Sequence, residues 1–233
     1  MSRIVWDKPE ERKFEAGVSK GVLYVDGGEG VPWNGLVSIQ DSLSGADVES
    51  RYQDGVKTHN YVPPQEFETE ITALTYPDEF ERCLGFYEAI DGVFVDEQPR
   101  VPFGMTYQTL VGDAVVGTQR GYRIHLIYNA IATPNQILRT TIGSETSPTE
   151  FSWGVKTAPI EAPGFRPASH FSLDPTRMGP RMFKHICDRL YGAPGIPPQL
   201  LTPRDILEIV EDWQVLYPSN TTYPSLETLP GGP

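Results

Sequence analysis

The alternation of apolar and polar positions predicts a chain made mainly of β-strands. Strand-like runs cover residues 21–25, 31–39, 103–111, 122–131, 137–142 and 150–159. Successive side chains of a strand point to opposite faces, so alternation indicates a half-buried strand and a continuous apolar run indicates a buried one. Residues 122–128 are nearly continuous and mostly apolar, and we expect them in the middle of a sheet.

Residues 66–75 form the most informative of these strand-like runs. Glu66, Glu68 and Glu70 fall on one face of the predicted strand, whereas Phe67 and Ile71 fall on the other. Carboxylates arranged in this way would repel one another and lose their hydration if they were buried. The glutamate face is therefore predicted to meet water.

An Asp-Gly pair predicts a β-hairpin between residues 46 and 62. Asp54 and Gly55 separate two strand-like runs, residues 46–52 and 56–62. This dipeptide favours the tight turn of an antiparallel hairpin. Because the hairpin is long and hydrophilic, its tip is expected to project from the body of the protein.

Three helices are predicted. A short one covers residues 76–85, where Gly85 suits a helix end. A second covers residues 177–190, and a third covers residues 203–213, with Thr202 as its N-cap.

Three prolines within residues 159–167 predict a domain boundary. The expected organisation is a β-domain with an N-terminal arm over residues 1–160 and a partly helical segment over residues 161–217. A flexible, proline-rich tail over residues 218–233 follows.

The charge of the chain indicates whether nucleic acid is a suitable binding partner. The 233 residues carry a formal net charge of −12, and 14 acidic but only three basic residues lie between positions 41 and 97. Proteins that grip nucleic acid need lysine and arginine against the phosphates, so this balance disfavours DNA binding and favours a surface that repels DNA.

The cysteines and the chain start indicate a protein made in the cytoplasm. Cys83 and Cys187 stand far apart in no CxxC pattern, and we expect two reduced thiols. The first residues contain no signal-peptide core, and no apolar run is long enough to cross a membrane.

Candidate chemistry is sparse. Gly17, Ser19 and Gly21 match the GxSxG motif of serine hydrolases, but a strand rather than a helix is predicted to follow it. Phosphate-binding, dinucleotide-binding and zinc-protease motifs do not occur. We therefore predict no catalytic residue, no cofactor and no enzymatic activity.

The histidines give no sign of a metal site. The chain contains His59, His125, His170 and His185, and none lies at ligand spacing from another histidine or from a cysteine. His125 falls within the apolar run at 122–128, which indicates a structural role. The sequence therefore predicts no metal ligand.

Several segments, taken in order, resemble the major tail proteins of siphophages, especially those of actinobacterial hosts. The resemblance spans about two thirds of the chain, and the blocks that carry it are residues 6–7, 14–18, 21–24, 31–36, 76–80, 121–128 and 151–153.

The resemblance implies a tail-tube-like β-sandwich or barrel with a short flanking helix, plus a C-terminal extension with one or two helices. It implies hexameric rings that stack into a hollow tube through which DNA passes without specific binding. The implied location is the virion tail, assembled in the host cytoplasm. The implied partners are other copies of the chain, the tape measure protein, the tail terminator and the distal tail protein, with no membrane contact.

Two site hypotheses follow from the resemblance and the patterns together. Glu66, Glu68 and Glu70 are expected to line the lumen, where a negative wall would let DNA pass. The hairpin is expected to join one ring to the next through residues near its turn: Arg51, Tyr52, Asp54, Gly55 and Lys57.

Three alternatives remain open from the sequence. A tail terminator or distal tail protein would share the fold but form single rings. A carbohydrate-binding β-sandwich would stack sugars on tryptophans, for which Trp6, Trp33, Trp153 and Trp213 are available. A hydrolase would depend on Ser19.

Overall fold

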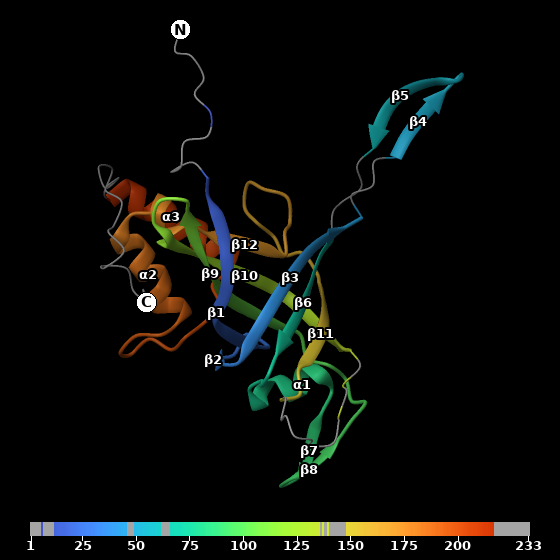
Figure 1. The fold of residues 1–233 in the computed structure, drawn as a ribbon, viewed down its shortest axis with the longest axis vertical. Coiled ribbons are helices and arrows are strands. Elements are labelled where there is room, and N and C mark those ends of the chain that lie inside the picture. The colour runs from blue at the N-terminus through green and yellow to red at the C-terminus, as the bar shows by residue number, and fades with distance from the viewer. Residues whose placement is uncertain are drawn as a thin grey trace.

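An eight-stranded antiparallel sheet organises the computed structural model, which describes residue 6 and residues 12–45, 49–61, 66–135, 137, 139 and 148–216. Its path runs β2-β1-β9-β10-β11-β6-β3, and β12 pairs with β10 beside that path (Figure 1). The strands are β1 (Phe14–Val25), β2 (Gly30–Trp33), β3 (Leu36–Ser44), β6 (Glu66–Ala73), β9 (Phe103–Asp113), β10 (Gly117–Pro134), β11 (Phe151–Thr157) and β12 (His170–Leu173). The mainly β prediction is confirmed.

The sheet folds over on itself around an aromatic core. β1 and β3, which lie far apart along the strand order, approach each other across the fold. Trp33 and Trp153 are almost fully buried there, with ring centroids 5.8 Å apart. Phe80 packs against both tryptophans and is brought in by the predicted short helix, which consists of a 3₁₀ turn (Asp78–Phe80) and α1 (Glu81–Leu84). Gly85 ends it at a φ of 84°, as predicted.

The middle of β10, residues 121–128, is largely buried on both faces. Ile127 faces the aromatic core, whereas Ile124 and Leu126 face a second core formed with α2 (Pro180–Leu190) and α3 (Pro203–Leu216). This arrangement explains the nearly continuous apolar run at residues 122–128.

The two C-terminal helices follow their local signals. α3 begins with the predicted cap, because the Asp205 amide donates to Thr202 Oγ1 at 3.2 Å. α2 begins at Pro180 and not at residue 177, because Pro175–Arg177 forms a separate 3₁₀ turn.

Beyond the proline-rich loop, the chain returns to the main sheet. β12 pairs with β10 from Ile124 to Ile127. The helices that follow cover the outer face of β10 (Figure 1). The division at residue 160 stays a prediction, and residues 218–233 lie outside the described part of the chain.

One strand was predicted wrongly. Residues 31–39 do not form a single strand, because the chain turns between β2 and β3 at Gly35, whose φ is 79°. Only glycine adopts this left-handed conformation without strain. The predicted strand at 137–142 lies largely outside the described residues.

Two hairpins extend from the body at opposite ends of the molecule. β4 (Glu49–Gln53) and β5 (Val56–Tyr61) form one, and β7 (Tyr87–Ile90) and β8 (Val93–Val95) form the other (Figure 1). The first was predicted, including its turn, where Asp54 and Gly55 have φ values of 49° and 76°. The second was not predicted.

Candidate functional site

The acidic strand has the predicted alternation. Along β6, Glu66 and Glu70 are exposed and Glu68 is half-buried, whereas Phe67 and Ile71 are buried. The strand is held between β3 and β11, so its outward face is continuous with theirs. The three glutamates therefore lie in a row on one water-facing surface.

This surface, which we call the acidic face, has only small or polar neighbours. The register partners of the glutamates on β3 and β11 are small or polar: Gln40, Ser42, Ser44, Gly154 and Lys156. A shallow depression of about 390 Å³ lies over it, lined by Glu68 and Glu70 among others. Its lining is mostly polar, with Val155 as the one aliphatic residue, and this chemistry suits a water-facing surface.

Two of the glutamates have partners. Glu68 lies 3.4 Å from Lys156 Nζ, which sits directly opposite on β11. Glu70 accepts hydrogen bonds from Ser152 Oγ at 2.7 Å and Asn135 Nδ2 at 3.0 Å. With three carboxylates and one ammonium group, the acidic face keeps a net charge of −2.

β3 is the edge of the sheet beside the acidic face. In the part of the chain that the structure describes, β3 pairs with β6 on one side and with no strand on the other. An edge strand presents a row of backbone donors and acceptors that can pair with another chain. Continuation of the acidic face across a neighbouring copy would use this edge.

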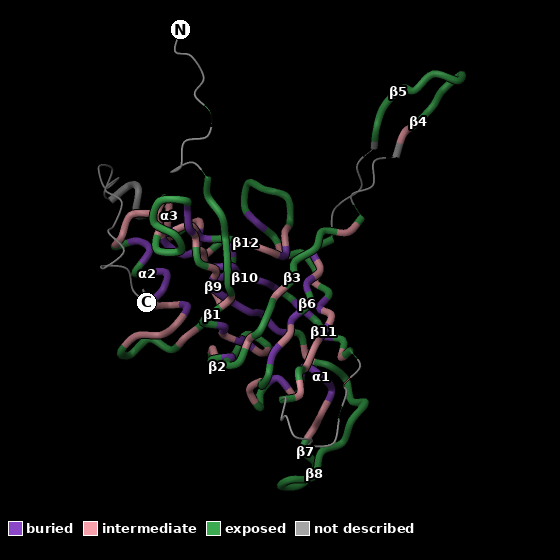
Figure 2. Tube along the Cα trace, in the orientation of Figure 1, coloured by how far each residue is buried: buried purple, intermediate pink, exposed green. Residues whose placement is uncertain are grey.

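The projecting β4–β5 hairpin carries the predicted contact residues. Arg51, Tyr52, Asp54, Gly55 and Lys57 are all exposed, and Figure 2 shows residues 51–60 of the hairpin as exposed. The strands are held together by cross-strand bonds such as Thr58 Oγ1 to the Arg51 carbonyl at 3.1 Å.

The β7–β8 hairpin at the opposite end exposes a more apolar surface. Ile90, Val93, Phe94 and Val95 are each more than two fifths exposed. A cluster of this kind on a short ribbon is typical of a contact surface.

The structure places the residues on which two alternative chemistries depend. Ser19 lies inside β1 opposite Gln108, and the strand continues to Val25, so the GxSxG sequence does not form the strand–turn–helix of a nucleophile elbow. Trp33 and Trp153 are core residues, which removes them as sugar platforms. Trp6 is exposed, and the side chain of Trp213 is outside the described part.

The cysteines are confirmed as free thiols. Cys83 belongs to the aromatic core and Cys187 to the helix-covered core. Burial raises the pKa of each thiol to about 12.

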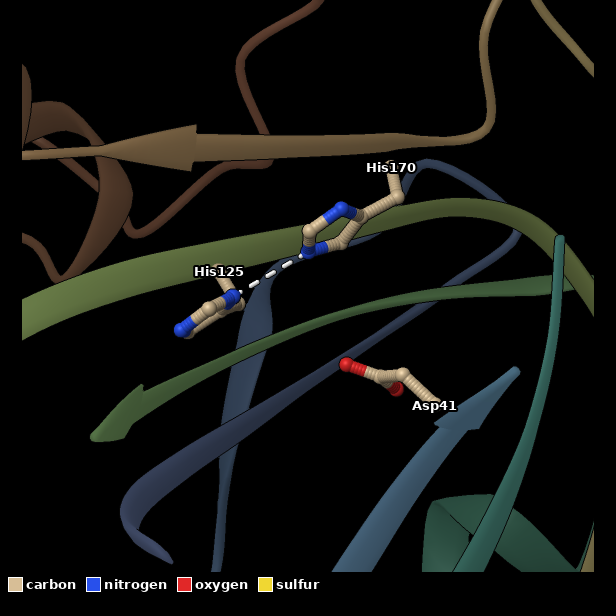
Figure 3. Close-up of side chains that lie close together, drawn as sticks. All are labelled: Asp41, His125 and His170. Carbon is tan, nitrogen blue, oxygen red and sulfur yellow. Dashed lines mark hydrogen bonds between the residues drawn. The ribbon is translucent and has the colours of Figure 1, made fainter. Parts of the chain in front are cut away.

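The fold assembles one cluster that the sequence did not indicate. Asp41 on β3, His125 on β10 and His170 on β12 each place a ligand-type atom within 4.8 Å of the others (Figure 3). The prediction of no metal ligands relied on spacing along the chain. Pairing of β12 with β10 brings the two histidines together, and folding of the sheet adds Asp41, 129 positions before His170. Only the pairing of β12 with β10, which the sequence pattern did not reveal, would have pointed to them.

Comparisons with known proteins give weak likenesses. No protein-family model and no curated protein matches the chain. A chain of the sheath–tube complex of an extracellular contractile injection system (PVC), in its extended state, is 12% identical. That match covers 66% of this chain and 88% of the other, with a TM-score of 0.30. A chain of the sheath/tube terminator of that system, in its extended state, is also 12% identical. That match covers 74% of this chain and 100% of the other, with a TM-score of 0.28. Likeness at this level does not identify the chain.

In the described residues, no helix is both long and apolar enough to cross a bilayer.

Proposed function

We propose that this chain is a structural subunit of a phage-type tail, specifically the major subunit of a tail tube. In this proposal, copies form rings, six to a ring as in siphophage tails of the actinobacterial kind, and the rings stack around a lumen that passes DNA. The chain acts without catalysis and without an obligatory cofactor. Its location is the virion tail, after assembly in the host cytoplasm.

The acidic face carries the proposal. It is a water-facing surface with a net charge of −2, bordered by the edge of β3 that pairs with no strand among the described residues. Pairing of that edge with a neighbouring copy would repeat the face around a ring. A wall of hydroxyls and carboxylates repels phosphates, so DNA would slide past it without being held.

The two hairpins support stacking of such rings. They lie at opposite ends of the molecule, and most of their described residues are exposed (Figures 1 and 2). Tyr52 and Val56 on the first hairpin are 67% and 66% exposed, and Ile90 on the second is 72% exposed. Covering these side chains by contact with another copy would remove apolar surface from water.

Other tail proteins are the proposed partners of the tube. The tape measure protein would occupy the lumen during assembly, and the tail terminator and distal tail protein would close the two ends. A terminator or distal tail role for this chain itself is the alternative. Only stacking of many rings by the purified chain distinguishes the tube from these single-ring roles.

Negative-stain electron microscopy of the purified chain at high concentration tests the proposal. Hollow tubes of stacked rings are the expected result. Isolated rings that never stack would assign the chain to a terminator or distal ring. If the chain stays monomeric, the same measurement is repeated with a purified tail-tip complex as template, and failure to extend that template would refute the tube assignment.

A further inference from the structure

Three strands bring two imidazoles and a carboxylate to one point between the halves of the folded sheet. Nδ1 of His125 and Nε2 of His170 are 3.1 Å apart, and Asp41 turns its carboxylate toward them (Figure 3). Two ligands bound at about 2.1 Å to a tetrahedral ion lie about 3.4 Å apart. The histidine pair already has nearly this spacing, and the exposed Asp41 side chain needs to move by only about 1 Å to complete it.

Hydrogen bonds from Glu15 through Thr109 determine which nitrogen of His125 carries the proton. Thr109 Oγ1 donates to the Glu15 carboxylate at 3.2 Å, and its oxygen lies 3.0 Å from His125 Nε2. Because its one proton goes to Glu15, Thr109 accepts from Nε2–H. His125 therefore carries its proton on Nε2 and presents the Nδ1 lone pair to the cluster. Such outer partners are typical of histidines that bind metal ions.

The rings are also held in place by packing. Tyr107 stacks on His125 with centroids 4.7 Å apart, and Phe67 stacks on His170 at 4.8 Å. Tyr107 Oη donates to one oxygen of Asp41 at 2.5 Å, which orients the carboxylate. Ligands held in this way lose little freedom when an ion binds.

The proton of His170 completes the account of the pair. Because His125 presents the Nδ1 lone pair, His170 Nε2–H donates in the 3.1 Å bond between the two rings. When an ion binds, this proton moves to Nδ1 of His170, and its Nε2 lone pair becomes the second nitrogen ligand.

We propose that Asp41, His125 and His170 form a binding site for one divalent transition-metal ion per subunit. Two imidazoles and one carboxylate suit Zn²⁺, Co²⁺ or Ni²⁺, whereas Mg²⁺ and Ca²⁺ prefer ligand sets made entirely of oxygen. Three protein ligands leave a fourth position for water. The ion would tie β3 to β10 and β12. This inference is independent of the proposed function, because it depends on contacts within one subunit.

The test uses the full untagged chain, stripped with EDTA and dialysed. Isothermal titration with Zn²⁺ at neutral pH should show one site per subunit, and Mg²⁺ should not compete. With Co²⁺ as the probe, a visible absorption band typical of nitrogen and oxygen ligands should appear and saturate at one equivalent. Absence of stoichiometric Zn²⁺ and Co²⁺ binding by the folded wild-type chain overturns the proposal and leaves a hydrogen-bonded histidine pair.

Matched variants separate this site from other histidines. His170→Gln should abolish stoichiometric binding, and Thr109→Val should weaken it by about 10- to 100-fold because the Nε2–H partner is lost. His59→Gln, on the exposed β4–β5 hairpin, should bind as the wild type does. Circular dichroism of each metal-free variant checks that it folds. Unchanged affinity in a folded His170→Gln chain, or loss of binding in His59→Gln, would refute the assignment.

Discussion

Reversing the charge of the acidic face should retain the tube but make it bind DNA. In the triple variant Glu66→Lys, Glu68→Lys and Glu70→Lys, the net charge of the face, including Lys156, changes from −2 to +4 per subunit. Each lysine that contacts a phosphate makes the slope of the logarithm of the DNA-binding constant against the logarithm of salt concentration steeper by about 0.9. DNA passing through a ring of such subunits would meet many of these contacts at once.

The cost to folding should be small. Glu66 and Glu70 are exposed, and substitutions at such positions usually change stability by less than about 0.5 kcal/mol. At position 68 an ion pair with Lys156 becomes a like-charge pair, which costs about 0.2–1 kcal/mol. The total of about 1–2 kcal/mol is well below a typical stability of about 5–15 kcal/mol.

The assay has two parts. Electron microscopy should show tubes in the lysine variant, and co-sedimentation with linear DNA should show binding that weakens steeply as salt increases. Particles assembled with the variant should release DNA slowly or not at all. A triple Glu→Gln variant is the control, because it removes the charge without adding cations, and it should bind DNA weakly. Normal DNA release through lysine-lined tubes would refute the assignment of this face to the lumen.

Three further predictions concern other parts of the molecule. Replacing residues 52–57 of the β4–β5 hairpin by Asn-Gly should give rings that do not stack, as seen by electron microscopy; normal tubes would exclude the hairpin from ring-to-ring contacts. Cys83 and Cys187 should react with a thiol reagent only after unfolding, because burial raises the pKa of both to about 12; rapid labelling of the native chain would contradict their burial. Asp113 accepts hydrogen bonds from the Val116 and Val115 amides, which lower the pKa of its carboxyl group. The ionised carboxylate therefore stabilises the folded chain at any pH above the unfolded-state pKa of about 4. This stabilisation is lost as the pH falls through the lower pKa of the folded state. The melting temperature of Asp113→Asn should accordingly differ most from wild type near neutral pH and converge with it in acid; a difference independent of pH would contradict this account.

Local signals in the sequence were sufficient where one segment determines its own structure. The alternation along β6 and the Asp54-Gly55 turn depend on neighbouring residues, and both were predicted. The same kind of signal marks two further turns that the predicted elements did not include. Asn34-Gly35 marks the turn between β2 and β3, and Asp91-Gly92 marks the turn of the β7–β8 hairpin.

The histidine cluster depends on contacts that local patterns do not encode. His125 and His170 meet because four residues of β12 pair with the middle of β10. The strand is short and follows a proline-rich loop, so its partner cannot be read from periodicity. Asp41 joins them only because the sheet folds over, which brings β3 across from β10.

The position of the two hairpins would give a stack of subunits a direction. They differ in length and composition and lie at opposite ends, so a copy that stacks on another joins two unlike surfaces. Heterologous contacts that repeat along one axis do not close on themselves, and they generate a filament with a distinct head and tail. A stack built in this way would grow by adding the same surface at each step, and its length would have to be set by a component other than the subunit.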